Sequence, residues 1–408
     1  MQRFRARWLL PIAAAPIPDG ALLVDDAGNI IQVGADEVIP IPPDAAAVDL
    51  GDAVLLPGLV NTHSHLELTG FAGKVNEASF LDWIAGVIRI KSGRSEQEFF
   101  DAACDGVRLM WRSGVTTVCD TGSTGAVIAA LDHLGASGIY HHEVFGAHPD
   151  QCQPAMRQFE ADLNRLARHA VGRVGLGVSP HAPYTVSGAL YAASADLARA
   201  HGVPMAVHVA EPAGEGQLLR EFEGIFAEDF KRRGIPRPAP EGDSPIKYLE
   251  RHRVLSDRTL CIHVIDVDEA DADVMARHGV AVAHCPRSNR FHHHADAPIR
   301  RYLDRNLRVG LGTDSEISVD PPDLIAEARE ARRLARWSAS ETLRALTLGG
   351  AEAIERDAET GSLTPGKRAD LVAIRVTETN DPEEAVLAAG PGQVAGTWLA
   401  GRQVHHAG

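Results

Sequence analysis

The chain alternates between short apolar runs rich in β-branched residues and longer segments whose apolar positions follow a helical period. Segments such as 154–170 and 187–201 have the helical spacing and lie between apolar runs. Strands that alternate with helices form parallel sheets, because each helix returns the chain to the end of the sheet where the next strand begins. The predicted strands span residues 55–65, 114–120, 138–146, 172–183, 204–211, 259–267, 280–289 and 308–316.

Eight strand–helix units predict an α/β fold of the TIM (β/α)8 barrel type, which takes roughly 250 residues. A doubly wound open sheet is the competing architecture. Both ends of the chain differ from the middle, because residues 21–34 and the segments GSLTPGKRADLVAI and GTWLAGRQV combine strand and turn signals. We therefore expect a small β-sandwich domain built from residues 1–56 and 361–408, flanking a barrel of residues 57–360.

Composition and charge narrow the class of protein. Apolar residues make up 45% of the chain and charged residues 23%, which is typical of a soluble globular protein. There are 40 Lys and Arg residues against 55 Asp and Glu residues, so the net charge of −15 disfavours a nucleic-acid partner. No apolar run reaches 18 residues, so we expect no membrane span.

The cysteines favour a reducing, cytoplasmic location. There are five of them, an odd number in a long chain, and none forms a CxxC pair. The apolar run WLLPIAAAPI follows three arginines, as in a secretory leader, but two prolines interrupt it and a predicted strand pair comes next. The partner that we expect is a small-molecule substrate, and a homodimer is compatible with this sequence.

Histidines and carboxylates gather where the predicted strands end. The carboxyl ends of all strands in a parallel barrel open on one face, and that face carries the active site. Side chains that are far apart in the sequence can therefore converge. They are His63 and His65 on the first strand, His181 after the fourth, His208 and Glu211 at the fifth, His263 at the sixth, His284 on the seventh and Asp314 at the eighth.

The spacing of His63 and His65 predicts a metal site. Alternate residues of a strand point the same way, so both rings project into the mouth of the barrel. His208 and Asp314 complete a set of three nitrogen ligands and one oxygen ligand, which suits zinc and also ferrous iron. Any one of these histidines alone is more simply interpreted as a hydrogen-bonded, partly buried residue. Their shared position at strand ends favours the metal site.

The same residues predict a hydrolytic mechanism. A bound metal ion lowers the pKa of its water from 15.7 to about 7, which makes hydroxide available at neutral pH. Glu211 lies three residues after His208 and is expected to protonate a substrate ring nitrogen and then the leaving group. Asp314 ligates the metal and accepts a proton, while His263 hydrogen-bonds the attacking hydroxide. The alternative for Glu211 is a surface carboxylate or a neighbour of a helix N-cap.

With these residues in place, the chain resembles the amidohydrolase superfamily, and in particular its mononuclear aminohydrolase branch. That branch contains cytosine, guanine, S-adenosylhomocysteine and aminodeoxyfutalosine deaminases and the triazine hydrolases. The matching motifs cover nearly the whole length and are PGLVNTHSH, GVTTV, SPHAPYTVS, HVAE, HCPRSN, GLGTDS and TPGKRADLVAI. Predicted strand four reads GVSPHAP and carries no lysine, so the resemblance implies one metal ion, Zn²⁺ or alternatively Fe²⁺.

The resemblance also implies roles for individual residues and a substrate class. It implies a deaminase that removes an exocyclic amine from a purine- or pyrimidine-like compound. The segments NTHSHLEL, FLDWI and HCPRSN resemble most the aminodeoxyfutalosine-type deaminases. The ribose-binding glutamate of adenosine-type enzymes is missing, because Ile90 to Gly93 follow the helix of Trp83. The implied ligands are His63, His65, His208 and Asp314, the implied catalytic residues Glu211, His263 and Asp314, and the implied substrate contacts His181, Trp83 and Asn289.

Two alternatives and one departure stay open. The same site could hydrolyse another bond, as a triazine chlorohydrolase or an amide hydrolase does, or the chain could be a non-catalytic binding protein of this fold. The departure is FHHHADAP after HCPRSN, where the family has a small, Gly-containing loop. His292 to His294 could support the site from behind its ligands or form an exposed loop, and we expect the loop, because three successive side chains cannot all face one ion.

Overall fold

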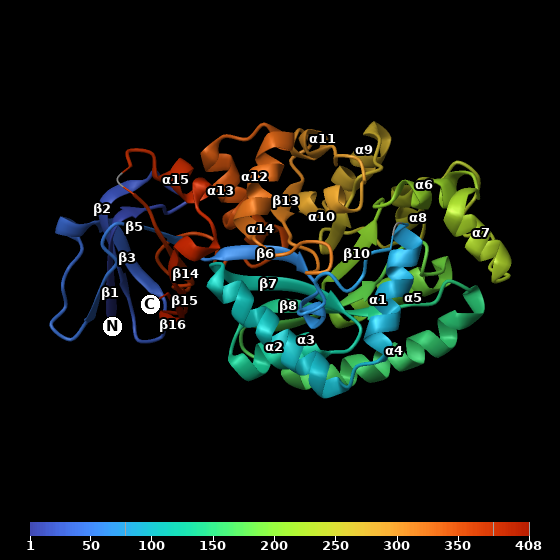
Figure 1. Ribbon diagram of the computed structural model, residues 1–408, viewed down its shortest axis with the longest axis horizontal. Helices are drawn as coiled ribbons and strands as arrows, with labels where there is room; N and C mark the ends of the chain where they lie inside the picture. The colour runs from blue at the N-terminus through green and yellow to red at the C-terminus, as the bar shows by residue number, and fades with distance from the viewer. Residues whose placement is uncertain (78, 378, 408) are drawn as a thin grey trace.

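Eight parallel strands form a barrel in the order of the sequence, which confirms the predicted fold class (Figure 1). The structure is a computed structural model that describes residues 1–77, 79–377 and 379–407. Its barrel strands are β6 (Leu59–Ser64), β7 (Val115–Gly122), β8 (Ser137–Val144), β9 (Val174–Pro180), β10 (Met205–Val209), β11 (Thr259–His263), β12 (Ala281–His284) and β13 (Arg308–Leu311).

The barrel closes between its first and last strands. Ser64 and Asp314 form an isolated parallel bridge, and the main-chain N–H of Asp314 donates to the carbonyl of His63 at 3.1 Å. Apolar side chains such as Val60, Ile139 and Ile262 fill the interior, as in other barrels of this size. Most barrel strands are buried along their whole length, because helices cover the outside while the barrel's interior is packed with side chains.

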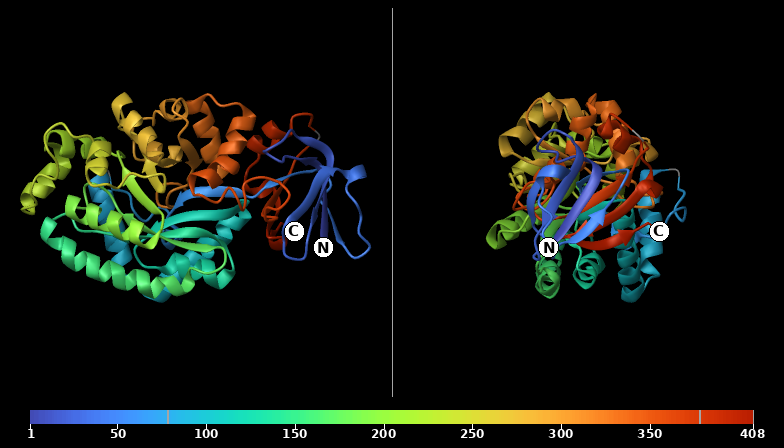
Figure 2. Two further views of the ribbon diagram at one scale, coloured as in Figure 1. Left: turned by 180° about the vertical axis from the view of Figure 1, so that it is seen from behind. Right: turned by 90° about the vertical axis from the view of Figure 1, so that its left-hand side faces the viewer.

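Helices lie around the outside of the barrel, as Figures 1 and 2 show. Many begin at a serine or aspartate whose side chain accepts a hydrogen bond from the first turn, as at Ser95 before α2 and Asp268 before α9. Within the described residues, no helix is both long and apolar enough to span a lipid bilayer. The helices are α1 (Phe80–Ser92), α2 (Glu96–Arg112), α3 (Ala126–Leu134), α4 (Cys152–Leu166), α5 (Gly188–His201), α6 (Ala213–Arg220), α7 (Gly224–Arg232), α8 (Pro245–Arg251), α9 (Glu269–His278), α10 (Pro286–Phe291), α11 (Ile299–Leu303), α12 (Leu324–Ala335), α13 (Ala339–Leu346), α14 (Leu348–Ala353) and α15 (Pro382–Ala388).

A second sheet joins the two ends of the chain at one end of the molecule, where blue and red strands lie together in Figures 1 and 2. Its order is β16-β15-β14-β5-β1-β2-β3, and β4 pairs with β1. The N-terminal half meets the C-terminal half where β5 runs antiparallel to β14. Its strands are β1 (Gln2–Leu9), β2 (Ile17–Val24), β3 (Ile30–Ala35), β4 (Ala46–Asp49), β5 (Ala53–Pro57), β14 (Leu371–Arg375), β15 (Val394–Leu399) and β16 (Arg402–His406).

This second sheet curls over its own core, as the expected sandwich requires. β1 and β15 are separated by two strands, so in a flat sheet they would be about 14 Å apart. Instead Phe4 of β1 and Trp398 of β15 pack edge to face with ring centroids 5.5 Å apart. Their rings, together with side chains such as Leu22, Leu55 and Leu371, form a separate apolar core. The sheet thus buries one face against itself.

The second sheet abuts the amino ends of the barrel strands, away from the face where the polar side chains gather. The Arg368 guanidinium donates to the hydroxyl of Ser137, the first residue of β8, at 3.1 Å. The Thr397 hydroxyl donates to the carbonyl of Trp111, close to the start of β7, at 2.7 Å. The carboxyl ends of the strands are therefore left free for a functional site.

The predicted strand 55–65 is in fact two strands that belong to different sheets. β5 ends at Pro57 and β6 begins at Leu59. Between them, the N–H of Gly58 bonds the carbonyl of Asp370 at 2.8 Å, while the N–H of Leu59 bonds Gly114 in the barrel at 2.9 Å. The apolar run looks continuous because both strands are buried, and periodicity alone does not reveal a change of sheet.

We expect Gly58→Ala to lower the free energy of unfolding by about 1–3 kcal/mol. The added methyl group would overlap the buried Thr116 side chain in a junction that both sheets hold in place. Urea denaturation followed by circular dichroism measures the change. Gly390→Ala is the control, since a methyl group there meets no atom within 4 Å. An equal urea midpoint for the two variants would contradict the close contact between Gly58 and Thr116.

Candidate metal centre and active site

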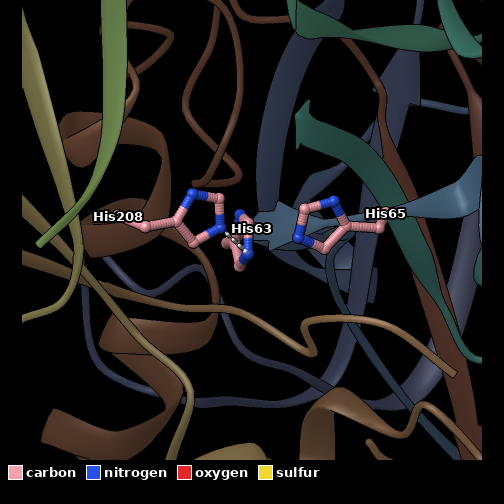
Figure 3. Close-up of side chains that lie close together, drawn as sticks. All are labelled: His63, His65 and His208. Carbon is pink, nitrogen blue, oxygen red and sulfur yellow. Dashed lines mark hydrogen bonds between the residues drawn. The ribbon is translucent and has the colours of Figure 1, made fainter. Parts of the chain in front are cut away.

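Three histidines converge at the carboxyl ends of β6 and β10, and their rings face one another (Figure 3). The Nε2 atoms of His63 and His208 are 3.3 Å apart. Asp314, just beyond β13, brings its Oδ1 atom to 3.5 Å from Nε2 of His63 and 3.4 Å from Nε2 of His65. The four side chains predicted as metal ligands therefore meet at one point.

The distances between these atoms fit a metal ion better than direct hydrogen bonds. Ligands about 2.0–2.1 Å from a tetrahedral ion lie about 3.3–3.4 Å apart. The observed separations of 3.3, 3.4 and 3.5 Å match that spacing. Burial lowers the pKa of His63 to about 4 and the pKa of His208 well below its usual value. At neutral pH both rings are therefore uncharged and offer lone pairs, as metal ligands must.

A neighbouring hydrogen bond sets the orientation of His65. Its Nδ1 atom lies 2.8 Å from the carbonyl oxygen of Thr121, the penultimate residue of β7. A carbonyl only accepts, so Nδ1 carries the proton and Nε2 presents its lone pair to the centre. The side chain of Asp314 is held in the same way, because the Ser288 hydroxyl donates to its Oδ2 atom at 2.5 Å. Such supporting contacts are usual around metal ligands.

Several residues around the site have positive φ angles, which are unfavourable for residues other than glycine. Ala210, His263, Val264 and Asp314 all have φ between 50° and 69°. Each such non-glycine residue costs about 1–3 kcal/mol and persists only where its surroundings hold it. Here the Ala210 N–H donates to the buried Glu215 carboxylate at 2.7 Å, and Asp314 is held by the bridge to β6. The strain turns Glu211, His263 and Asp314 toward the same space.

Glu211 lies beside His263 and lines the same cavity as His65, His208 and Asp314. Its Oε1 atom is 3.5 Å from Nε2 of His263 and 3.7 Å from Nε2 of His294. Burial alone would raise the pKa of Glu211, but attraction to His263 and His294 outweighs it and brings the pKa to about 2. The carboxylate is therefore charged at neutral pH and is free to accept a proton.

These groups line one cavity of about 200 Å³. Trp83 and His181, two of the predicted substrate contacts, are in its wall, together with Phe80 and Tyr184. His181 is oriented by its Nδ1 atom, which lies 2.8 Å from the Thr185 hydroxyl. Asn289 is placed differently, because it lies behind His263 with its Oδ1 atom 2.9 Å from Nδ1 of that ring. It therefore orients His263 and does not line the cavity.

The expectation of an exposed loop at His292 to His294 is wrong for two of its three residues. Only His293 is exposed. His292 lines the cavity and packs against Trp83 with ring centroids 4.5 Å apart, while His294 faces Glu211. The turn after α10 points alternate side chains inward, and the apolar rings of Phe80 and Trp83 cover them. The three histidines still do not face one ion.

Sequence reasoning missed two charged residues of the cavity, Lys91 and Glu143. Glu143 is the penultimate residue of β8, so the rule that polar strand ends form the site would have found it. Lys91 lies near the end of α1, and its ammonium group bonds the buried Glu67 at 2.5 Å. No local pattern marks Lys91, because its partner comes from a different segment. His284 is buried at the end of β12 but does not line the cavity.

Comparison with known proteins agrees with this geometry. A model of the amidohydrolase family matches residues 54–404. A 5-methylthioadenosine/S-adenosylhomocysteine deaminase of Nitratidesulfovibrio vulgaris is 30% identical over 382 residues, which cover 90% of this chain and 81% of the relative. A zinc-bound adenosine deaminase of Xanthomonas campestris superposes with a TM-score of 0.86 at 25% identity, covering 98% of this chain and 92% of the other. The aminofutalosine deaminase of Helicobacter pylori shares the fold, with a TM-score of 0.87 at 20% identity over 99% of this chain and 100% of the other.

We expect His208→Ala to reduce bound divalent metal from about one ion per chain to a small fraction of that. The variant removes one of the nitrogen donors, and losing even a supporting contact costs 10–100-fold in affinity. Elemental analysis of the purified protein measures the content. His293→Ala is the control, since that ring is exposed and outside the centre. Undiminished metal in His208→Ala would exclude this centre.

Proposed function

The chain belongs to the amidohydrolase family, and from this premise we propose that it is a metal-dependent hydrolytic deaminase. It removes an exocyclic amine from a purine-like or related heteroaromatic compound and releases ammonia. The observation that carries the proposal is that the Glu211 carboxylate shares a cavity with His65, His208 and Asp314, which meet His63 to form the donor set. The relatives named as deaminases support the same reaction.

The donor set suits one divalent ion, and we propose zinc, with ferrous iron as the alternative. Zinc and ferrous iron can both be bound by three imidazoles and one carboxylate. The zinc in the Xanthomonas campestris deaminase, which is 25% identical, favours zinc here. When bound, such an ion supplies a Lewis acid that makes water acidic enough to act as a nucleophile near neutral pH.

Glu211 is proposed as the proton shuttle of the reaction. Because its pKa of about 2 keeps it ionised, it accepts a proton from the attacking water. It then delivers that proton to the ring nitrogen beside the amine-bearing carbon, to which the water oxygen has bonded. The proton that remains on this oxygen is passed to the amine, the carbon–nitrogen bond breaks, and ammonia leaves behind a ring carbonyl. The backbone strain at Ala210 and the contact with Glu215 hold Glu211 at the position that this transfer needs.

His263 and Asp314 are proposed to orient the water. Asn289 accepts from Nδ1 of His263 and so fixes the ring, whose Nε2 lies 3.5 Å from Oε1 of Glu211 at the edge of the cavity. Asp314 offers Oδ1 next to the histidines while Ser288 holds Oδ2. Aligned groups of this kind lower the barrier because they need no reorganisation during the reaction.

We also propose a reducing cellular location. All five cysteines are free, and four of them are buried. A chain that folds without disulfides suits the cytoplasm, where thiols stay reduced.

Glu211→Gln is expected to keep its metal and to lose turnover by about 10²–10⁴-fold. The amide has the shape of the carboxylate but cannot shuttle a proton. Ammonia release from a panel of aminopurines, aminopyrimidines and their nucleosides, with metal-loaded protein, measures the loss. Glu228→Gln, on an exposed face of α7, is the control. Wild-type turnover in Glu211→Gln would remove this residue from the mechanism, and release of another leaving group without ammonia would replace the deaminase with a different hydrolase.

A further inference from the structure

A register shift in β6 leaves one of the metal ligands without regular main-chain support from β7. Asn61 pairs with Val118 of β7. The next pair joins Ser64 to Asp120, so β6 advances three residues there while β7 advances two. An extra residue of this kind disrupts the ladder locally and re-aims the neighbouring side chains. His63 lies within the shifted stretch, so its position depends on groups other than its ladder with β7.

The side chain of Asn61 bridges the first and last strands of the barrel beside that shift. Its Oδ1 atom accepts from the main-chain N–H of His63 at 3.3 Å and from the N–H of Thr313 at 3.1 Å. Its Nδ2 atom donates to the Thr313 hydroxyl at 2.8 Å. Because main-chain N–H groups only donate, the orientation of the amide is fixed. One fully buried side chain thus ties His63 to the residue before Asp314.

Asp120, also fully buried, supports the other histidine of the pair. β6 ends at Ser64, and His65 has already left the extended conformation with a ψ of 71°. The Oδ2 atom of Asp120 bonds the Ser64 hydroxyl and accepts from the N–H of Leu66, both at 2.8 Å. One carboxyl oxygen therefore holds the residues on both sides of His65.

Both side chains act where small displacements matter. The ligand distances of a metal site are defined to within about 0.2 Å. Each of the two oxygens bonds two groups next to the ligands, so the loss of either oxygen frees the chain at two points. Neither Asn61 nor Asp120 lines the cavity, so neither touches a substrate there. Their effect on the reaction passes through the metal ligands.

We propose that Asn61 and Asp120 are positioning residues of the metal centre. Asn61 sets His63 relative to Asp314, and Asp120 sets His65. The two side chains replace the main-chain ladder that the register shift interrupts. This inference rests on the metal centre of the proposed function, and it does not depend on which bond the enzyme hydrolyses.

The first experiment measures the affinity for Zn²⁺ by competition with a chelator. Asn61→Leu and Asp120→Leu keep the size of the side chain and remove the oxygen, and we expect each to weaken Zn²⁺ binding by about 10–100-fold. Asn61→Asp and Asp120→Asn keep an oxygen at the same place and should recover most of the affinity. Burial raises the pKa of Asp120 well above its usual value, so the neutral amide is a close replacement. Wild-type affinity in a leucine variant overturns the inference for that residue.

Asp271→Leu is the matched control for a purely structural role. Asp271 is likewise fully buried and bonds the hydroxyl of Ser244, but it lies on α9 and does not line the cavity. This variant should lower the urea midpoint of the metal-free protein and leave the affinity for Zn²⁺ unchanged. If Asp271→Leu weakens Zn²⁺ binding as much as Asp120→Leu does, the loss reflects stability alone and the inference is overturned.

The visible absorption of the protein loaded with Co²⁺ tests the geometry directly, because these bands depend on how the ligands are arranged. At saturating Co²⁺ we expect altered bands in Asn61→Leu and Asp120→Leu, and wild-type bands in Asp120→Asn and Asp271→Leu. Wild-type bands in both leucine variants overturn the inference. A wild-type protein that binds Zn²⁺ but releases no ammonia from any substrate contradicts the proposed deaminase alone, and the same comparisons still decide the roles of Asn61 and Asp120.

Discussion

One main-chain contact organises the functional face, and it is the closure of the barrel between β6 and β13. The N–H of Asp314 donates to the carbonyl of His63, so the bond that completes the barrel also brings the carboxylate next to the histidines. The two residues are 251 positions apart in the chain. Without closure, the last strand would be an open edge and the donor set would lack its oxygen. Fold stability and metal binding are therefore coupled through this contact.

The residues proposed to act on substrate are held mostly by contacts from outside the cavity. Thr121 orients His65, Asn289 orients His263 and Ser288 holds Asp314. The supporting groups come from β7 and α10, so the barrel and its first surrounding layer set the geometry before any ligand arrives. This preorganisation is what electrostatic catalysis requires. The strained backbone at Ala210 and Asp314 is tolerated because neighbouring strands hold it.

Polar groups of the cavity that have no hydrogen-bond partner are as informative as those that have one. Lys91 and Glu67 neutralise each other, and the orienting side chains have partners. Glu143 stands out because it is buried, burial raises its pKa, and its Oε1 atom has no hydrogen bond within the described part of the chain. The cavity thus combines the histidines of the donor set, the buried Glu143 close to His181, and an apolar rim.

The sequence by itself determined the alternation of strands and helices, the barrel and the candidate ligands at strand ends. Those features follow from local periodicity and from the rule that parallel strands share one open face. Only the tertiary structure decided that the apolar run around Gly58 serves two sheets, that Asn289 lies behind His263, and that His292 and His294 turn inward. It also decided that Oε1 of Glu143 has no hydrogen-bond partner among the described residues, while Lys91 is paired with Glu67. The reason is physical: pairing and burial depend on which side chains meet across the fold, and a local pattern carries no information about its distant neighbours.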